Sequence, residues 1–228
     1  MKKILLGILA VVVVAILIIV VNLLVFLNNM SHVSEGIPLP EYDVEMPALM
    51  VIDLQGNTTG ETSTHEHFLD ISAELIAKVN ELIEASDNAD VPVIYVRSEI
   101  HKPLINLINN SMAKGSIGSE LDPRLKVVSD LHVTKDREDA FSNPQLDSIL
   151  LQRKISKLYF VGLDAAHCVN STIQAAQNRN YSISVISDAV VSESIEMKDS
   201  ILSEFSKREI QIISMEEYLE QLIPLPER

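Results

Sequence analysis

Cysteine and tryptophan are the scarcest residues in this 228-residue chain, which has one cysteine, Cys168, and no tryptophan. A single cysteine excludes a disulfide, a two-cysteine redox site and a cysteine-based metal cluster within the chain. A lone cysteine is most often a small buried apolar residue, so a catalytic role for Cys168 requires a specific environment. Aromatic residues make up only 4% while isoleucine, leucine and valine are plentiful, which predicts an aliphatic core typical of sheets covered by helices on both faces.

Basic residues are also scarce, with 18 lysines and arginines against 32 aspartates and glutamates and a formal charge of -14. Lys2 and Lys3 are the only charged residues before Glu35, so the chain beyond them has 16 basic and 32 acidic residues, a charge of -16. This excess of acid argues against nucleic acid as a partner. An acidic surface is also repelled by anionic lipid headgroups, so we expect membrane association to come from an apolar segment and not from the face of the domain.

The longest apolar run lies at the N-terminus, where residues 4–27 are apolar except for one glycine and one asparagine. As a helix this run would be about 36 Å long, enough to cross a bilayer with some tilt. A cleaved signal peptide is the alternative, but its apolar core is usually about 7 to 15 residues long and ends at a small-x-small site. We therefore expect a transmembrane anchor over residues 1–30, a linker containing chain breakers over residues 31–46 and a globular domain over residues 47–228.

The orientation of the anchor is predicted by the basic residues around it. Lys2 and Lys3 precede the apolar run, and no basic residue follows it before Lys78. The positive-inside rule then places the N-terminus in the cytoplasm and the domain on the extracytoplasmic side of the membrane.

Beyond the linker, short apolar runs typical of buried strands alternate with segments that have the apolar spacing of helices. Strands are predicted over residues 48–54, 91–96, 125–128, 157–162, 182–187 and 210–213, and helices over residues 68–85, 144–152, 169–179 and 195–205. This alternation implies right-handed crossovers. The sequence therefore predicts an α/β fold of three α/β/α layers with a mainly parallel sheet.

Two candidate functional residues fall at the C-terminal edge of this predicted sheet, where ligands of such folds bind. Asp53 stands at the end of the first strand, and Cys168 follows the strand that ends at Gly162. Cys168 should lie at the N-terminus of the next helix, where unpaired N–H groups and the helix dipole favour a thiolate and could hold an oxyanion. This environment suits a nucleophile.

At this point the chain resembles the isochorismatase-like cysteine hydrolases, in particular the branch of nicotinamidases and N-carbamoylsarcosine amidases. Three motifs in the same order carry the resemblance, which covers about residues 47–215. They are the strand end at residues 52–55, Lys135 six residues before Phe141, and Gly162-Leu163 followed by Cys168-Val169 at the start of a helix. The segments at residues 115–120 and 187–189 are similar in the same way.

The resemblance implies a catalytic set of Asp53, Lys135 and Cys168. In this set Asp53 accepts the thiol proton, Lys135 orients the carboxylate and lowers the thiol pKa, and Cys168 attacks a carbonyl or similar carbon to give a thioester that water hydrolyses. It also implies a cis peptide bond between Leu163 and Asp164, and an oxyanion hole made by the N–H groups of Asp164 and Cys168.

The candidates for contact with a substrate are three residues in or beside the motifs: Gln55, Phe141 and His167. His167 stands directly before the cysteine, so it could instead tune the thiol or cap the helix.

The metal site of nicotinamidase-type members is only partly represented. Those proteins use an aspartate-x-histidine pair after the second strand together with further histidines, whereas here Glu99 and His101 stand at that place and the next histidine is His132. Three or more protein ligands are usual, so we predict no metal and no other cofactor. His65 and His67 lie in the first loop, where a solvated position is the simplest interpretation.

Isochorismatases proper lack the cysteine, so Cys168 favours cleavage of the amide or related C–N bond of a small molecule over vinyl-ether hydrolysis. The alternative is a catalytically silent, membrane-tethered binding or scaffolding protein with the same fold. A nucleotide-binding domain is disfavoured because residues 55–60 match neither G-x-G-x-x-G nor a P-loop. Members of the superfamily often form dimers or tetramers, so the resemblance extends to a homo-oligomer.

Overall fold

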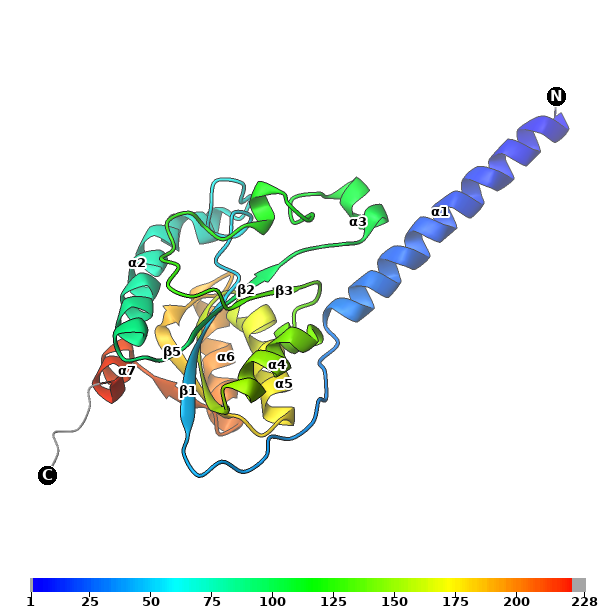
Figure 1. The fold of residues 1–228 in the computed structure, drawn as a ribbon. Coiled ribbons are helices and arrows are strands. Elements are labelled where there is room, and N and C mark those ends of the chain that lie inside the picture. Colours follow the sequence, from blue (N-terminus) through cyan, green and yellow to red (C-terminus); the bar gives the residue numbers. More distant parts are fainter. Residues whose placement is uncertain (1, 223–228) are drawn as a thin grey trace, which may run out of the picture.

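A six-stranded parallel sheet lies between two layers of helices, and one long helix projects away from it (Figure 1). The computed structural model describes residues 2–222. The strands are β1 (Met46–Ile52), β2 (Val93–Ser98), β3 (His132–Lys135), β4 (Ile155–Gly162), β5 (Ser182–Val190) and β6 (Gln211–Ile213). All strand pairs are parallel, which confirms the predicted three-layer α/β fold.

Two separate apolar clusters hold the helices on the sheet. One face is covered by α2 (Glu66–Asn88) and α7 (Met215–Leu222), and the other by α4 (Pro144–Gln152), α5 (Asn170–Asn178) and α6 (Ile195–Lys207). Alternate residues of β1 enter alternate clusters: Met50 packs with α4 and α5, and Val51 packs with α2. Because both faces of β1 are covered, its residues 48–52 have no exposed surface, as its unbroken apolar run predicts.

The strand order β3-β2-β1-β4-β5-β6 creates a switch point in the middle of the sheet. The chain moves from β1 through β2 to β3 at one edge, and then returns so that β4 pairs with the other side of β1. Connections therefore leave β1 and β4 in opposite directions, which opens a crevice beyond their C-terminal ends.

The predicted strand over residues 125–128 is wrong, because the third strand is β3, seven residues further along the chain. Side chains take the hydrogen bonds of the earlier segment: Lys126 N donates to Asn80 Oδ1 (2.7 Å) and Val128 N to the Tyr95 hydroxyl (3.1 Å). A short segment whose backbone is paired with side chains in this way cannot join the sheet. The helices α3 (Pro103–Ile108) and α7 were not predicted either, whereas α4 has the predicted bounds.

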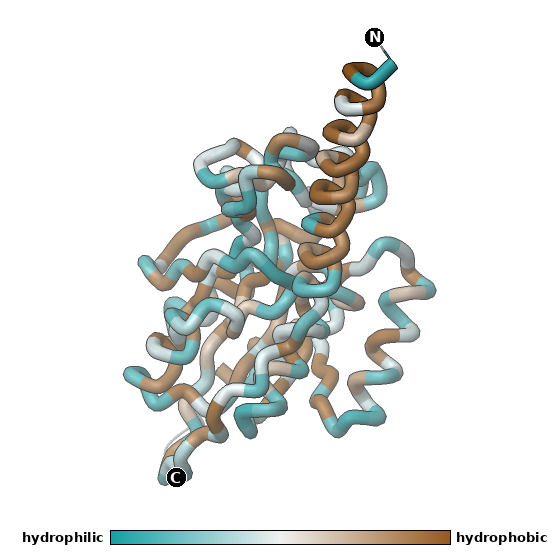
Figure 2. The backbone as a smooth tube through the Cα atoms, turned by 90° about the vertical axis from the view of Figure 1, so that its right-hand side faces the viewer, coloured by the Kyte–Doolittle hydropathy of each residue, from teal (hydrophilic) through white to brown (hydrophobic). Residues whose placement is uncertain are grey.

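The N-terminal helix α1 (Lys2–Met30) is long and apolar enough to cross a membrane, and its apolar side chains are exposed along its length. Figure 2 shows it as a mostly hydrophobic helix that extends away from the domain. By length and composition it is a candidate membrane span or a signal sequence.

The predicted linker is not free of the domain. Ser34 donates from its N–H and its hydroxyl to Asp139 Oδ2 (2.9 and 2.6 Å), and Leu39 N donates to the carbonyl of Arg179 (2.8 Å). Val33 also packs against the apolar cluster on that face. The segment between α1 and β1 is therefore attached to the domain surface, and β1 begins at Met46, the last residue of the predicted linker.

Candidate active site

Four polar side chains converge at the switch point. Asp53 follows β1, Ser98 ends β2, Lys135 ends β3, and Cys168 lies in the turn that follows β4. The parallel register brings these positions together, since Ser98 pairs with Lys135 and Ile52 pairs with Gly162 across neighbouring strands. Three of the four residues were predicted as site residues from the sequence. Ser98 was missed, although a polar residue just past a predicted strand was a usable signal.

Lys135 forms hydrogen bonds with each of the other three side chains in this group. Its Nζ donates to Asp53 Oδ2 (2.8 Å), to the Ser98 hydroxyl (2.8 Å) and to Cys168 Sγ (3.1 Å). The Ser98 hydroxyl in turn donates to the other carboxylate oxygen of Asp53 (3.2 Å). The Lys135 side chain is fully buried and that of Asp53 is 4% exposed, so the ion pair lies away from water and its hydrogen bonds replace hydration.

The charges of the group favour a protonated thiol at rest. Burial by itself lowers the pKa of Lys135, but the charges of Asp53 and Cys168 and the hydrogen bonds to them together outweigh burial and raise that pKa well above the usual range. Burial and, next, the Asp53 carboxylate raise the pKa of the Cys168 thiol, and Lys135 only partly opposes them. Both effects disfavour a thiolate at rest, because desolvation penalises a second anion beside Asp53; the thiolate expected from the helix N-terminus stays a prediction.

The turn that carries Cys168 is irregular where a regular helix was predicted. Residues Ala165–Val169 form a π-helical turn, and α5 begins only at Asn170. The peptide bond between Leu163 and Asp164 is cis, at the position that the resemblance implies. Asp164 closes the turn, since its Oδ1 accepts from Ala166 N (2.8 Å) and from the Ser192 hydroxyl.

Gly162 permits the chain to enter this turn. Its φ of +111° lies in the region that favours glycine, and a Cβ at this position would lie 2.1 Å from the carbonyl oxygen of Ile52. A side chain would therefore push β4 away from β1 where the two strands carry Asp53 and Cys168.

Most N–H groups of the turn already donate within the protein. Val169 N and His167 N both donate to the Asp164 carbonyl (3.0 and 3.1 Å), and Ala165 N donates to Val191 O (2.8 Å). Ala166 N is taken by the Asp164 carboxylate, as described above. Outside the helices and strands, the N–H groups of Asp164 and Cys168 make no backbone hydrogen bond among the described residues; their role as the oxyanion hole stays a prediction.

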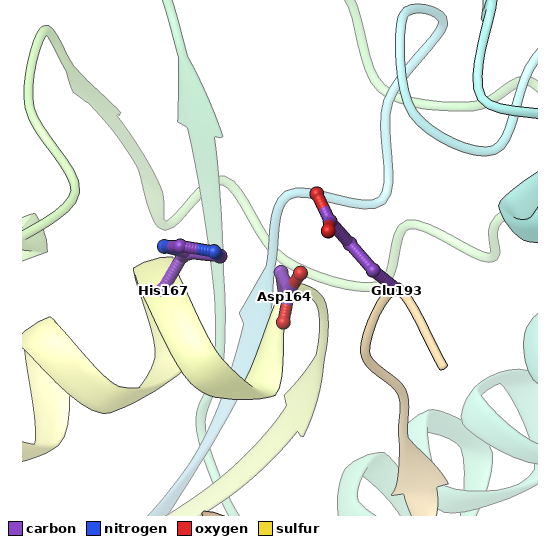
Figure 3. Close-up of side chains that lie close together, drawn as sticks. All are labelled: Asp164, His167 and Glu193. Atoms are coloured by element: carbon purple, nitrogen blue, oxygen red, sulfur yellow. The ribbon is translucent and has the colours of Figure 1, made fainter. Parts of the chain in front are cut away.

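The rim of the site carries a group of three side chains, Asp164, His167 and Glu193. Figure 3 shows the first two on the turn after β4 and Glu193 on the segment after β5, and their ligand atoms lie within 4.8 Å of one another. His167 is about half exposed, and its Nδ1 lies 3.7 Å from Glu138 Oε1. His167 is therefore partly open to solvent directly before Cys168, and its contact with a substrate stays a prediction.

Two of the three predicted substrate contacts face inward instead. Gln55 is fully buried: its Nε2 donates to the carbonyls of Ser98 (3.1 Å) and Gly118 (2.9 Å), and its Oε1 accepts from Ser98 N (2.7 Å). Phe141 is 3% exposed and packs under Arg179, whose guanidinium lies 4.4 Å from the ring centre. The side-chain amide of Gln55 therefore connects the end of β2 to the segment at Gly118 through hydrogen bonds. Phe141 belongs to the apolar core.

The residues at the metal position of nicotinamidase-type relatives do not fit a metal here. Glu99 Oε1 lies 3.0 Å from His101 Nε2, and Glu99 Oε2 lies 3.2 Å from the guanidinium of Arg97. A cation would compete with Arg97 for the same carboxylate and would have few other ligands. We therefore derive no step through a metal, and the prediction of a metal-free site stays a prediction.

A cavity of about 220 Å³ opens beside Lys135. It is lined by His101 from the segment after β2, by Asp136, and by Asn143 at the start of α4. The cavity lies against the end of β3, while the Lys135 ammonium group itself is buried behind it, in contact with Cys168.

Residues 47–217 match the model of the isochorismatase domain, three quarters of the chain. The chain belongs to the isochorismatase family. It is 26% identical over 179 residues to a ureidoacrylate amidohydrolase of Caulobacter segnis, covering 67% of this chain and 74% of that one. It is 24% identical over 189 residues to a probable inactive nicotinamidase of Arabidopsis thaliana, covering 77% and 95%. The structure of N-carbamoylsarcosine amidase from Thermoplasma acidophilum is 28% identical, with a TM-score of 0.62 over 75% of this chain and 96% of that chain.

Proposed function

We propose that this isochorismatase-family protein is a membrane-anchored cysteine hydrolase that cleaves the amide or related C–N bond of a small molecule. Cys168 is the nucleophile, Asp53 the proton acceptor and Lys135 the residue that holds both. The observation that carries the proposal is the position of Lys135 Nζ, 2.8 Å from the carboxylate and 3.1 Å from the sulfur, at a buried strand end. A buried lysine with these two partners is costly to maintain without a role.

The proposed reaction begins from a neutral thiol. Cys168 Sγ attacks the carbonyl carbon while its proton passes to Asp53, and the negative charge moves to the carbonyl oxygen, held by the N–H groups of Asp164 and Cys168. The tetrahedral intermediate collapses, the C–N bond breaks, and the proton on Asp53 passes to the leaving nitrogen. The product of this half is a thioester on Cys168.

Water completes the reaction in the second half. Asp53 accepts a proton from the water as its oxygen attacks the thioester carbon, and the C–S bond then breaks as the proton returns to sulfur. Lys135 keeps its proton throughout, because the adjacent carboxylate holds its pKa well above the usual range. Its positive charge stabilises the transient thiolate beside it.

The family relatives support C–N cleavage as the reaction class. A ureidoacrylate amidohydrolase and an N-carbamoylsarcosine amidase are both named for hydrolysis of a nitrogen–acyl bond. This chain carries the nucleophilic cysteine that such a thioester route requires. We propose a small-molecule substrate, with no nucleic acid partner, and a homo-oligomer as in the superfamily.

The membrane part of the proposal rests on α1. The helix exposes apolar side chains on all sides, so in water its whole surface would be unfavourably hydrated. We propose that α1 is an uncleaved single-pass anchor with the N-terminus in the cytoplasm and the domain outside it. Protease added to intact spheroplasts tests this orientation. Digestion of the domain agrees with it, whereas protection of the domain until the membrane is permeabilised would contradict it.

Activity is tested with the full chain in detergent and a panel of small amides that includes nicotinamide and N-carbamoyl compounds. We expect release of ammonia or amine from at least one compound, and a covalent acyl adduct on Cys168 when the reaction is stopped with acid. Cys168→Ala should abolish both signals. Undiminished release in that variant would contradict the mechanism.

The second candidate is a catalytically silent binding or scaffolding protein, favoured by the relative whose name marks it as probably inactive. The two candidates differ in the reactivity of the thiol. A hydrolase should have a Cys168 whose alkylation by iodoacetamide depends on Lys135, whereas a silent protein should have a sluggish thiol that Lys135→Met does not alter.

A further inference from the structure

The connection between β2 and β3 carries an exposed apolar surface that the proposed site does not use. We name residues 100–119 the β2–β3 segment; it contains α3 and lies beside α1 (Figure 1). Leu104, Leu107 and Ile117 are 42%, 83% and 65% exposed. Ile105 on α3 is buried at 9% exposure, whereas Leu104 and Leu107 on the same helix face the outside. Large apolar side chains exposed within one short segment in this way point to an interaction surface.

The charge of the β2–β3 segment differs from that of the rest of the domain. Between Glu99 and Glu120 the sequence has no acidic residue and has two lysines, Lys102 and Lys114, both exposed. The whole chain beyond Lys3 carries a charge of -16. An apolar and basic patch in an acidic domain is complementary to a lipid bilayer, which has an apolar interior and anionic headgroups at its surface.

The β2–β3 segment is held in a fixed shape. Ile100 N donates to Met112 O (2.7 Å), which joins the chain before α3 to the chain after it. Asn106 Nδ2 on α3 donates to Ile100 O (2.9 Å) and fastens the helix to the same residue. Its exposed leucines are therefore presented by an ordered structure and not by a loose tail.

The position of α1 indicates what the segment meets. α1 contacts α3, and the half-buried residues of α1, Phe26, Asn29 and Met30, all lie in its last two turns. The carbonyl of Met30 accepts from Glu138 N (3.0 Å), which ties the end of α1 to the domain. An apolar run about 36 Å long exceeds the hydrocarbon core of about 30 Å, so the last turns of a spanning α1 reach the headgroup level. The segment that contacts α1 lies at that level too.

We infer that the β2–β3 segment is a membrane-docking surface: Leu104, Leu107 and Ile117 enter the boundary between headgroups and acyl chains, and Lys102 and Lys114 contact anionic headgroups. The inference rests on the proposed anchoring by α1 and revises the expectation that the domain face stays off the bilayer. It also gives the site a direction, because His101, at the start of the segment, lines the cavity beside Lys135. The cavity is then held next to the bilayer surface.

The absence of tryptophan allows a direct test with single introduced tryptophans. The full chain is reconstituted into vesicles that contain anionic lipid and phosphatidylcholine with bromine at defined acyl positions. Leu107→Trp reports on the β2–β3 segment, Leu17→Trp on the middle of α1, and Leu151→Trp on the far end of the domain, where α4 ends. All three wild-type leucines are exposed, at 83%, 61% and 46%, so the variants should fold alike.

We expect loss of Leu107→Trp fluorescence with bromine near the headgroups, loss of Leu17→Trp fluorescence with deep bromine, and no loss for Leu151→Trp. If Leu17→Trp is quenched and Leu107→Trp is not, the anchor stands and the docking inference is overturned. If Leu17→Trp is not quenched, the anchoring proposal itself fails. A blue shift of Leu107→Trp that grows with protein concentration without quenching would mean that a second copy covers the surface, which also overturns the inference.

The two lysines are tested in the same background. In Leu107→Trp, adding Lys102→Gln and Lys114→Gln should reduce quenching on anionic vesicles toward the level on vesicles of phosphatidylcholine alone. Equal quenching on both vesicle types, with and without the lysines, would overturn their role as headgroup contacts.

Discussion

Replacing Asp53 by asparagine and Lys135 by methionine should change the reactivity of Cys168 in opposite directions. Asp53 raises the pKa of the thiol and Lys135 lowers it. Lys135 Nζ lies 3.1 Å from the sulfur. At an effective dielectric constant of about 20, a unit charge at that distance interacts with a thiolate by about 5 kcal/mol, or roughly 4 pKa units.

Partial hydration and the opposing partner reduce the net shift to about 1 to 3 units, the range found for charged neighbours. Below its pKa, a thiol loses a tenfold share of thiolate for each unit of increase. Lys135→Met should therefore slow alkylation of Cys168 at neutral pH by about tenfold or more, whereas Asp53→Asn should accelerate it by a similar factor. Turnover should be lost in both variants, since Asp53→Asn has a reactive thiol but no group to carry the proton.

The assay is alkylation by iodoacetamide across a series of buffers, followed by mass spectrometry, and the single cysteine makes the site unambiguous. The exposed pair of Lys126 and Glu84 supplies matched controls, because Lys126→Met and Glu84→Gln remove the same charges far from the thiol. Alkylation slowed equally by Asp53→Asn and Lys135→Met would refute the reasoning, since it would mean that Asp53 activates the resting thiol.

Stability must be measured on the same variants. Lys135→Met leaves the Asp53 carboxylate buried without its cation and should lower the free energy of unfolding by about 3 to 5 kcal/mol. The double variant Asp53→Asn/Lys135→Met removes both charges and should recover most of that loss. Recovery of stability without recovery of turnover separates the structural role of the pair from its chemical role.

Three further predictions concern the frame of the site and are measured by denaturant unfolding. Ser98→Ala removes one hydrogen-bond partner from each of the buried groups Asp53 and Lys135 and should lower the free energy of unfolding by about 1 to 3 kcal/mol. Ser98→Thr keeps the hydroxyl and should lower it by less. Gly162→Ala should cost about 3 kcal/mol or more, because it combines a strained φ with a clash against Ile52 O; a smaller cost would show that the strands can separate. Burial raises the pKa of Asp122, but hydrogen bonds led by Arg124 outweigh it and lower the pKa below its usual range, so the advantage of wild type over Asp122→Asn should be present at neutral pH and vanish in acid below about pH 4.

Much of the fold follows from local patterns in the sequence. The length of the apolar run predicts α1, and alternating apolar runs and helical spacings predict β1, β4, α4 and the three-layer fold, because burial on both faces of a strand leaves a direct mark on composition. The strand over residues 125–128 was wrong for the converse reason. Its apolar residues look like those of a strand, but Asn80 and Tyr95, distant in sequence, take its backbone hydrogen bonds.

The residues of the candidate site, too, can be predicted from the sequence only in part. Asp53, Lys135 and Cys168 can be selected from the order of three motifs, but nothing local places Lys135 within 3.1 Å of a sulfur 33 residues further along the chain. That approach depends on the strand order, which sets β3 beside β2 and β4 beside β1. Ser98, for the same reason, is identified only when its partners are known.

The sequence by itself determined the residue types available for chemistry, the anchor-like helix and the alternation that builds the sheet. The tertiary structure decided which side chains face one another: Gln55 and Phe141 turn inward, and Cys168 lies beside Asp53 as well as Lys135. It also placed the groups that shift the pKa of the thiol, because a pKa depends on burial and on the distances to all neighbouring charges. Both properties depend on interactions with several residues that folding brings together from distant parts of the chain, so no single stretch of sequence contains them.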